Sequence, residues 1–153
     1  MGYTHYFPMA KEIPQDQFSA FAEDCRKIIK HAQDVAGIEL DIRKVNDQEV
    51  WFNGVGDDAH ETFVVERRSV PESWQKPDED GLRFNCCKTA HKPYDAAVTA
   101  CLIALDANVE ACGLGSDGWA SEWEAGKALF AHATGKEPSD KDNVPWHESN
   151  MRG

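Results

Sequence analysis

The chain lacks both a hydrophobic run long enough to cross a membrane and an excess of positive charge. Its 153 residues contain no apolar stretch of the roughly 18 residues that a membrane-spanning helix needs. Lys and Arg total 16 against 27 Asp and Glu, which gives a formal net charge of −11. General nucleic-acid binding depends on neutralising phosphates with Lys and Arg, so this balance excludes it. We expect neither a membrane protein nor a general nucleic-acid binder.

The N-terminus also lacks the basic segment and apolar core of a secretory signal. Five cysteines are present, without a Cys-x-x-Cys pair or a spacing typical of zinc ligands. Reduced thiols in a reducing compartment are the simplest interpretation of an odd number of cysteines. We therefore expect a cytoplasmic protein with no metal and no cofactor.

Length and composition are those of one globular domain. The hydrophobic content is 41% and the charged content 28%, which are ordinary values. We predict a single α+β domain over residues 1–135 and a polar C-terminal tail over residues 136–153. Trp146 is the residue of this tail that we consider a candidate for docking on the domain.

Three segments have the patterns of helices. Apolar residues recur at three-and-four spacing over residues 15–36, and Gly37 follows as a stop signal. The segment 93–108 is apolar on nearly every side, which is typical of a central, buried helix. A third helix is expected to begin after Gly118 and to end before Gly135.

Short strand-forming segments lie between these helices. A turn-forming stretch, residues 54–58, separates two of them and predicts an antiparallel hairpin, and a polar loop is expected over residues 71–81. The order of elements has no regular βαβ alternation, so we predict an α+β fold. Its sheet is small and mostly antiparallel, and it packs with three helices, of which the middle one is buried. The predicted strands are Tyr3–Phe7, Ile38–Ile42, Val50–Asn53, Thr62–Glu66, Leu82–Cys87 and Ala111–Leu114.

Basic groups gather at the predicted start of the middle helix. Pro93 suits a first helical position, so Lys88, His91 and Lys92 would lie beside free backbone amides at the positive end of the helix dipole. Such a position favours an anion. Asp95 leaves an alternative open, because a first-turn carboxylate can itself satisfy the dipole and pair with a lysine. The candidate ligand-binding residues are Lys88, Thr89, His91, Lys92, Tyr94, Arg67 and His5.

Two other patterns suggest catalysis. His-Glu-Thr at 60–62 and His-Ala-Thr at 132–134 resemble the paired triplets of two-histidine phosphoesterases, in which one His is the base and the other the acid. The second triplet falls in a predicted helix, whereas those enzymes carry both on strands. Cys87 beside Lys88 and His91 could be an activated thiolate, although a buried thiol is the commoner state. We lean toward a protein without enzymatic activity, and the catalytic candidates are His60, His132 and Cys87.

An acidic stretch beside the first of these triplets has the residue types of a divalent-metal site. Asp57, Asp58, His60 and Glu61 offer carboxylates and an imidazole. Their spacing matches no strong metal motif, so we prefer an acidic hairpin loop.

Three segments resemble a family of small uncharacterised proteins of bacteria and bacteriophages. They are Met1-Gly2-Tyr3-Thr4-His5-Tyr6, Cys87-Lys88-Thr89-Ala90-x-Lys92-Pro93-Tyr94-Asp95 and Ser116-Asp117-Gly118. The likeness extends to about Phe130. The family has no established activity, so the resemblance implies only a prokaryotic or phage source. For a phage-encoded protein, the location would be the bacterial host cytoplasm.

The leading functional hypothesis is binding of a small anionic, nucleotide-like ligand. In a phage setting, the protein would sequester such a ligand and act against host defence signalling. One alternative is a nucleotide phosphodiesterase or hydrolase. Another is an inhibitor whose acidic surface covers a basic site on a host complex. The sequence leaves a homo-oligomer open.

Overall fold

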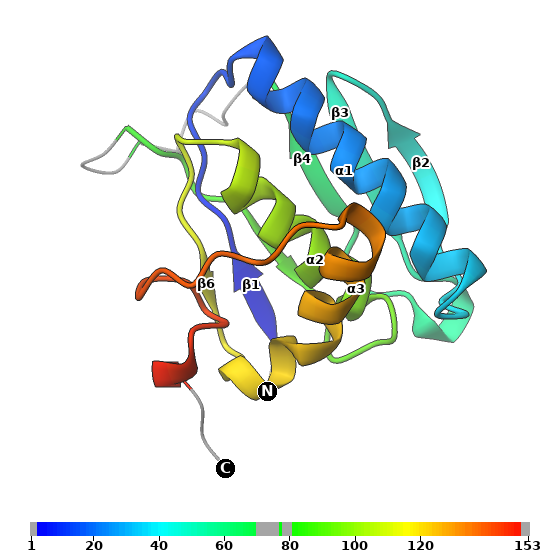
Figure 1. The fold of residues 1–153 in the computed structure, drawn as a ribbon. Helices are drawn as coiled ribbons and strands as arrows, with labels where there is room; N and C mark the ends of the chain where they lie inside the picture. The colour runs from blue at the N-terminus through cyan, green and yellow to red at the C-terminus, as the bar shows by residue number, and fades with distance from the viewer. Residues whose placement is uncertain (1–2, 70–76, 78–80, 151–153) are drawn as a thin grey trace.

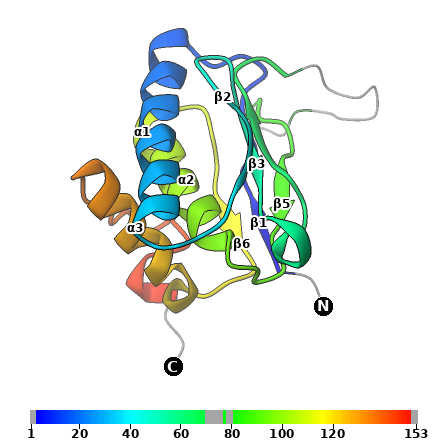
Figure 2. The ribbon, with the colours of Figure 1, turned by 90° about the vertical axis from the view of Figure 1, so that its right-hand side faces the viewer.

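Helices and strands separate into two layers in the computed structural model of the protein, which describes residues 3–69, 77 and 81–150. The α-helices cover one face of the strand layer, and Figure 2 shows the two layers edge on. This arrangement confirms the α+β fold class. Most of the predicted polar loop at 71–81 lies outside the described residues.

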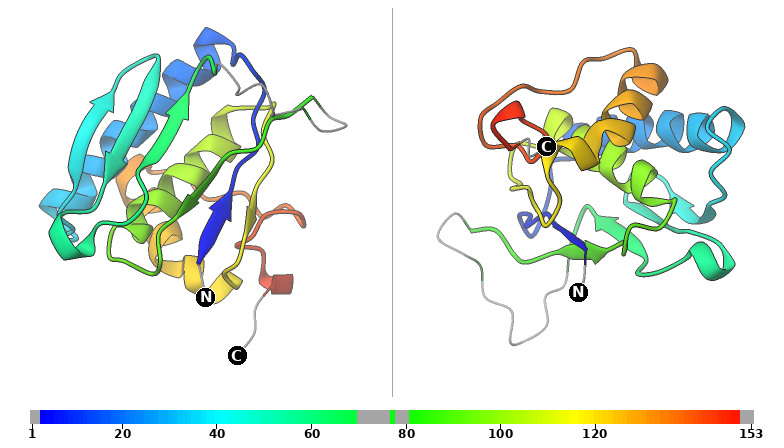
Figure 3. Two further views of the ribbon diagram at one scale, coloured as in Figure 1. Left: turned by 180° about the vertical axis from the view of Figure 1, so that it is seen from behind. Right: turned by 90° about the horizontal axis from the view of Figure 1, so that it is seen from below.

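The strands form two small antiparallel sheets in place of the single sheet predicted. Their orders are β5-β1-β6 and β2-β3-β4, and Figure 3 shows them from the face without helices. The sheets adjoin, because Ile13 N–H donates to Arg67 O at 2.9 Å and Glu61 N–H donates to Lys88 O at 3.2 Å. The strands are β1 (Thr4–Tyr6), β2 (Asp41–Val45), β3 (Glu49–Asn53), β4 (Phe63–Glu66), β5 (Cys86–Lys88) and β6 (Gly115–Ser116).

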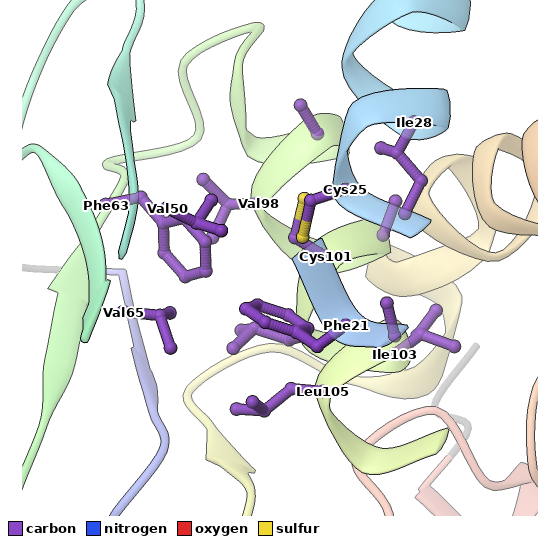
Figure 4. Close-up of a cluster of buried hydrophobic side chains, with 14 of the residues drawn as sticks. Phe21, Cys25, Ile28, Val50, Phe63, Val65, Val98, Cys101, Ile103 and Leu105 are labelled. Atoms are coloured by element: carbon purple, nitrogen blue, oxygen red, sulfur yellow. The ribbon is translucent and has the colours of Figure 1, made fainter. Parts of the chain in front are cut away.

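The middle helix is the centre of the core, as predicted. In α2 (Asp95–Asn108), every residue from 97 to 105 is buried. The apolar face of α1 (Gln15–Asp34) packs on α2, and Figure 4 shows Phe21 and Cys25 of α1 beside Cys101 of α2. α3 (Glu124–Thr134) packs on both of these helices (Figure 1). Three short 3-10 helices are η1 (Gly56–Asp58), η2 (Ala120–Trp123) and η3 (Glu148–Asn150).

Most predicted boundaries differ from those observed by one or two residues, and the strand predicted at 82–87 is much shorter, since β5 covers only Cys86–Lys88. Three other differences have a local cause. The strand predicted at 38–42 begins at Asp41, because the chain first turns away from α1 through Gly37, which has a left-handed φ of 69°. The strand predicted at 111–114 is interrupted where Cys112 N–H bonds to Glu110 O, and pairing with β1 resumes only in β6. The middle helix begins two residues after Pro93, since a turn occupies the preceding residues.

Part of the polar tail contributes to the core. Val144 and Trp146 are buried, and the Trp146 ring lies 5.3 Å from that of Trp123, centroid to centroid. The tail therefore crosses the end of η2. No helix in the described part of the chain is long and apolar enough to cross a membrane.

Candidate functional site

Three segments that are far apart in the sequence, residues 3–6, 87–95 and 116–118, meet at one end of the β5-β1-β6 sheet. In β1, His5 is paired with Cys87 of β5 on one side and with Ser116 of β6 on the other. Tyr3 O accepts the Thr89 N–H at 3.2 Å. Thr4 O accepts the Asp117 N–H at 2.9 Å. We call this region, residues 3–5, 88–95 and 116–118, the junction.

A chain of buried hydrogen bonds runs through the junction. His5 Nε2 lies 2.6 Å from Asp95 Oδ1, and His5 Nδ1 lies 2.8 Å from Ser116 Oγ. Thr89 Oγ1 donates to the same Asp95 oxygen at 2.6 Å. Both His5 and Thr89 have no exposed surface. The chain therefore ties the first turn of α2 to β1 and β6.

Donor and acceptor chemistry assigns the His5 tautomer. Ser116 Oγ accepts the Gly118 N–H at 2.9 Å and the Trp123 Nε1–H at 3.3 Å. Its own hydrogen is therefore available to donate to His5 Nδ1. That leaves the hydrogen on His5 Nε2, which faces the Asp95 carboxylate. Alternation along β1 explains the placement, since His5 faces the helices while Tyr6 faces outward and donates to Asp117 Oδ1 at 3.3 Å.

The loop between β5 and α2 has a strained backbone. Ala90 and His91 have φ values of 52° and 59°, in the left-handed region. That conformation costs about 1–2 kcal/mol for each residue with a Cβ. The His91 ring stacks on Tyr3, with centroids 3.6 Å apart and planes at 26°. His91 Nδ1 also lies 3.8 Å from a Glu122 carboxylate oxygen, and these contacts of the ring hold the strained turn in place.

The Tyr3 ring packs against this turn through its contact with His91. A Cβ at Gly118 would lie 2.4 Å from the Tyr3 hydroxyl oxygen, so the close approach of this ring requires glycine there. Burial raises the pKa of the Tyr3 hydroxyl, and the nearby Asp95 and Glu122 carboxylates raise it further. Tyr3 is therefore protonated at physiological pH.

The predicted ligand-binding residues of the junction divide into an accessible group and a buried group. Lys88 and Lys92 are partly exposed, and no carboxylate of the described residues forms an ion pair with either ammonium group. Thr89 and Tyr94 point inward instead, and Tyr94 OH donates to Glu61 O at 2.6 Å. Burial raises the pKa of the Tyr94 hydroxyl. Only the two lysines and His91 remain accessible to a ligand.

Arg67 is not brought to the junction. It follows β4 at the end opposite Glu61, so the length of that strand separates it from Lys88. Its Nε donates to Gln48 Oε1 at 2.9 Å, and a guanidinium nitrogen donates to Ile13 O at 3.2 Å. These contacts link the segment after β4 to the start of α1.

The two histidine triplets lie on different elements. His132 is in the last turn of α3, where its ring centroid is 6.1 Å from that of His31 on α1. His60 lies in the loop before β4, and its N–H is bonded to Asn53 Oδ1. Figure 2 shows α3 on the side of the helical layer away from the sheets. The paired arrangement of a phosphoesterase is therefore not formed.

The structure does not place Cys87 as an exposed thiol. The acidic loop, residues 57–61, forms no cluster of metal ligands among the described residues. The Cys87 thiol is fully buried and donates to Glu61 O at 3.5 Å. Burial, and then the Glu61 carboxylate, raise its pKa to about 12, so it is protonated at neutral pH. Within the described ranges, no three His, Cys, Asp or Glu side chains are placed to hold a metal ion.

Ser116 was not predicted as a site residue. Asp95 was predicted only as a first-turn carboxylate that could pair with a lysine. The alternation of β1 was a usable signal that His5 faces inward. No local pattern indicated that Ser116, which lies 111 residues away, would be its partner. Comparison of the chain with protein-family models, curated proteins and solved structures finds no match. The site is therefore assigned from its geometry.

Proposed function

We propose that the protein binds a small anionic, nucleotide-like ligand at the loop between β5 and α2. The observation that carries the proposal is the pair Lys88 and Lys92, which have no ion-pair partner among the described residues of a chain with net charge −11. Charge-assisted hydrogen bonds contribute about 1.5–3 kcal/mol each. Two such contacts favour a phosphate group over an uncharged ligand.

Backbone donors support the same position. The His91 and Tyr94 N–H groups donate to no acceptor in the part of the chain that the structure describes. Both lie just before α2, where the helix dipole favours negative charge. Asp95 lies in the first turn of α2, as the alternative of a capped helix start expects, and its Oδ1 is bound by His5 and Thr89. It forms no ion pair with Lys88 or Lys92, so the lysines are not engaged by this carboxylate.

An aromatic surface beside the lysines favours a nucleotide over a simple anion. The His91 side chain stacks on Tyr3, yet 63% of its surface is exposed. A base can stack on such a ring while its phosphates contact Lys88 and Lys92. The resemblance to phage and bacterial proteins supports a further step, in which the ligand is a host signalling nucleotide that the protein sequesters against host defence.

Thermal-shift measurements test the proposal on the purified chain. The probes are inorganic pyrophosphate, nucleoside mono- and diphosphates, and cyclic dinucleotides. A ligand that binds only the native state stabilises it by about 2.7 kcal/mol at a concentration of 100 Kd, so the unfolding midpoint rises. Mass spectrometry of small molecules released on heating identifies a ligand that co-purifies. The proposal fails if none of these probes raises the midpoint and no nucleotide is released.

A further inference from the structure

A second group of hydrogen-bonded polar side chains lies beside the Tyr3 ring. The ring stacks on His91 with one face and meets His5 edge-on, with centroids 5.0 Å apart. His5 forms two hydrogen bonds, one with Ser116 Oγ at 2.8 Å and one with Asp95 Oδ1 at 2.6 Å. The acceptor nitrogen of His5 faces the hydroxyl, and its N–H faces the carboxylate. This is the order of groups of an activated serine nucleophile, with the roles of the two ring nitrogens exchanged relative to the Ser-His-Asp triad.

Ser116 lines a cavity of about 380 Å³. Gly118 and Trp119 form part of its wall, and the tail residues Asn143 and Pro145 form another part. This volume is within the range of small-molecule sites. Ser116, whose hydroxyl is bound to the His5 imidazole, therefore borders a space for a small substrate.

The charge of the cavity wall indicates the substrate class. Asp117 and Asp142 both line it. Carboxylates repel an anionic substrate, so this cavity does not suit the ligand that we propose for Lys88 and Lys92. An uncharged or cationic carboxylic ester fits it better.

We infer that Ser116 is a nucleophile for acyl transfer, with His5 as its base and Asp95 as the residue that positions His5. Ser116 Oγ bonds to the carbonyl carbon of an ester, and its proton passes to His5 Nδ1. The bond from that carbon to the alcohol oxygen then breaks, and the alcohol leaves with the proton from His5. Water hydrolyses the acyl-serine by the same proton route, releasing the carboxylic acid and restoring the hydroxyl.

Two further N–H groups bond to the Ser116 oxygen. The Gly118 N–H and the Trp123 Nε1–H donate to Ser116 Oγ at 2.9 and 3.3 Å. One of these bonds must break before an Oγ lone pair can reach a carbonyl carbon, and the other can stabilise the oxygen as it gains negative charge. The same bonds also hold the turn after β6, so the test must separate reactivity from folding.

A small, uncharged alkyl fluorophosphonate is the probe. Its phosphorus bonds to Ser116 Oγ, fluoride leaves, and the proton is taken up by His5, which gives a stable adduct. We expect peptide mapping of the unmodified chain to place this adduct on Ser116. Ser116→Ala should lose the adduct, whereas Ser121→Ala, which changes an exposed serine of η2, should keep it. Absence of an adduct on Ser116, under conditions that saturate a known serine hydrolase, overturns the inference.

The role of Asp95 has its own readout in the rate of labelling. Asp95→Asn should lower that rate by roughly a hundredfold or more, because the carboxylate no longer orients the imidazole or stabilises its charge. Asp16→Asn, which changes an exposed carboxylate in the first turn of α1, is the matched control and should label at a rate within a few-fold of the parent. Equal labelling rates for Asp95→Asn and the parent contradict the assigned role.

Discussion

His5 Nε2 lies 2.6 Å from Asp95 Oδ1, and this contact joins the first strand to the first turn of the central helix. The His5 side chain is fully buried, and 16% of the Asp95 side-chain surface is exposed. Lys88 is the last residue of β5 and Lys92 lies in the loop that leads to Asp95, so the contact also fixes the end of that loop at the start of α2. Both proposed activities therefore depend on one buried hydrogen bond.

Asp95→Ala should lower the free energy of unfolding by about 1–3 kcal/mol, because it leaves the buried His5 N–H without its acceptor. Urea denaturation measures the change. Asp57→Ala, which removes an exposed carboxylate from the first turn of η1, is the matched control and should stay within about 0.5 kcal/mol of the parent. Equal effects of the two substitutions would show that the buried contact is not important for stability.

Leu102→Ala should cost about 2–5 kcal/mol, since Leu102 is fully buried in the centre of α2 and its truncation leaves a cavity. Val35→Ala removes methyl groups from a side chain that is 69% exposed, and its effect should lie within about 0.5 kcal/mol. Denaturant melts of both variants test the location of the core. A Leu102→Ala protein as stable as the parent would contradict this fold.

Gly126→Ala should destabilise the protein by about 1–3 kcal/mol, even though alanine is the better helix former. A Cβ at this position would lie 2.0 Å from Thr99 Oγ1 and 3.1 Å from Ala100 N, so α3 would have to move away from α2. Thermal denaturation measures the loss. Adding Thr99→Ala removes the nearest atom, and the double variant should be more stable than expected from the sum of the single changes.

Stability should fall as the pH rises above 9. The folded state holds the Cys87 proton to a pKa of about 12, whereas an unperturbed thiol has a value near 9.0. Between these values the unfolded chain binds fewer protons than the folded chain, so the free energy of unfolding decreases with pH, by up to about 1.4 kcal/mol per unit for this thiol.

The pH prediction is tested by urea melts in a reducing buffer at several values from pH 8 to the alkaline limit of folding. The difference between the parent and Cys87→Ala isolates this thiol from the lysines and tyrosines that titrate nearby. The slope for Cys87→Ala should be shallower than that for the parent. Parallel slopes would contradict the buried, protonated state of Cys87.

Features that depend on local composition were predictable from the sequence. The burial of residues 97–105 follows from an almost wholly apolar helix, and the end of α1 follows from Gly37. The features that were not predicted depend on pairing between strands that are distant in the sequence. β6 exists because Gly115 and Ser116 reach β1, and nothing in their own sequence has the pattern of a strand.

The same distinction applies to the candidate site. Lys88, His91 and Lys92 were found because they lie within five residues of one another just before a helix. Arg67 was grouped with them on charge alone, and the structure separates it by the length of β4. The Ser116–His5 contact depends on strand register between distant segments, which a single sequence does not encode in a local pattern.

The most direct test of the proposed anion site is calorimetric titration of inorganic pyrophosphate into three proteins. They are the parent, Lys88→Ala/Lys92→Ala, and Lys11→Ala/Lys27→Ala, which removes the same charge from two exposed lysines elsewhere. The loss of two charge-assisted contacts should weaken binding tenfold or more in the first variant. The control should bind within about threefold of the parent, since exposed charges at a distance are screened by salt. Equal affinities of Lys88→Ala/Lys92→Ala and the parent, or an equal loss in the control, would contradict the site.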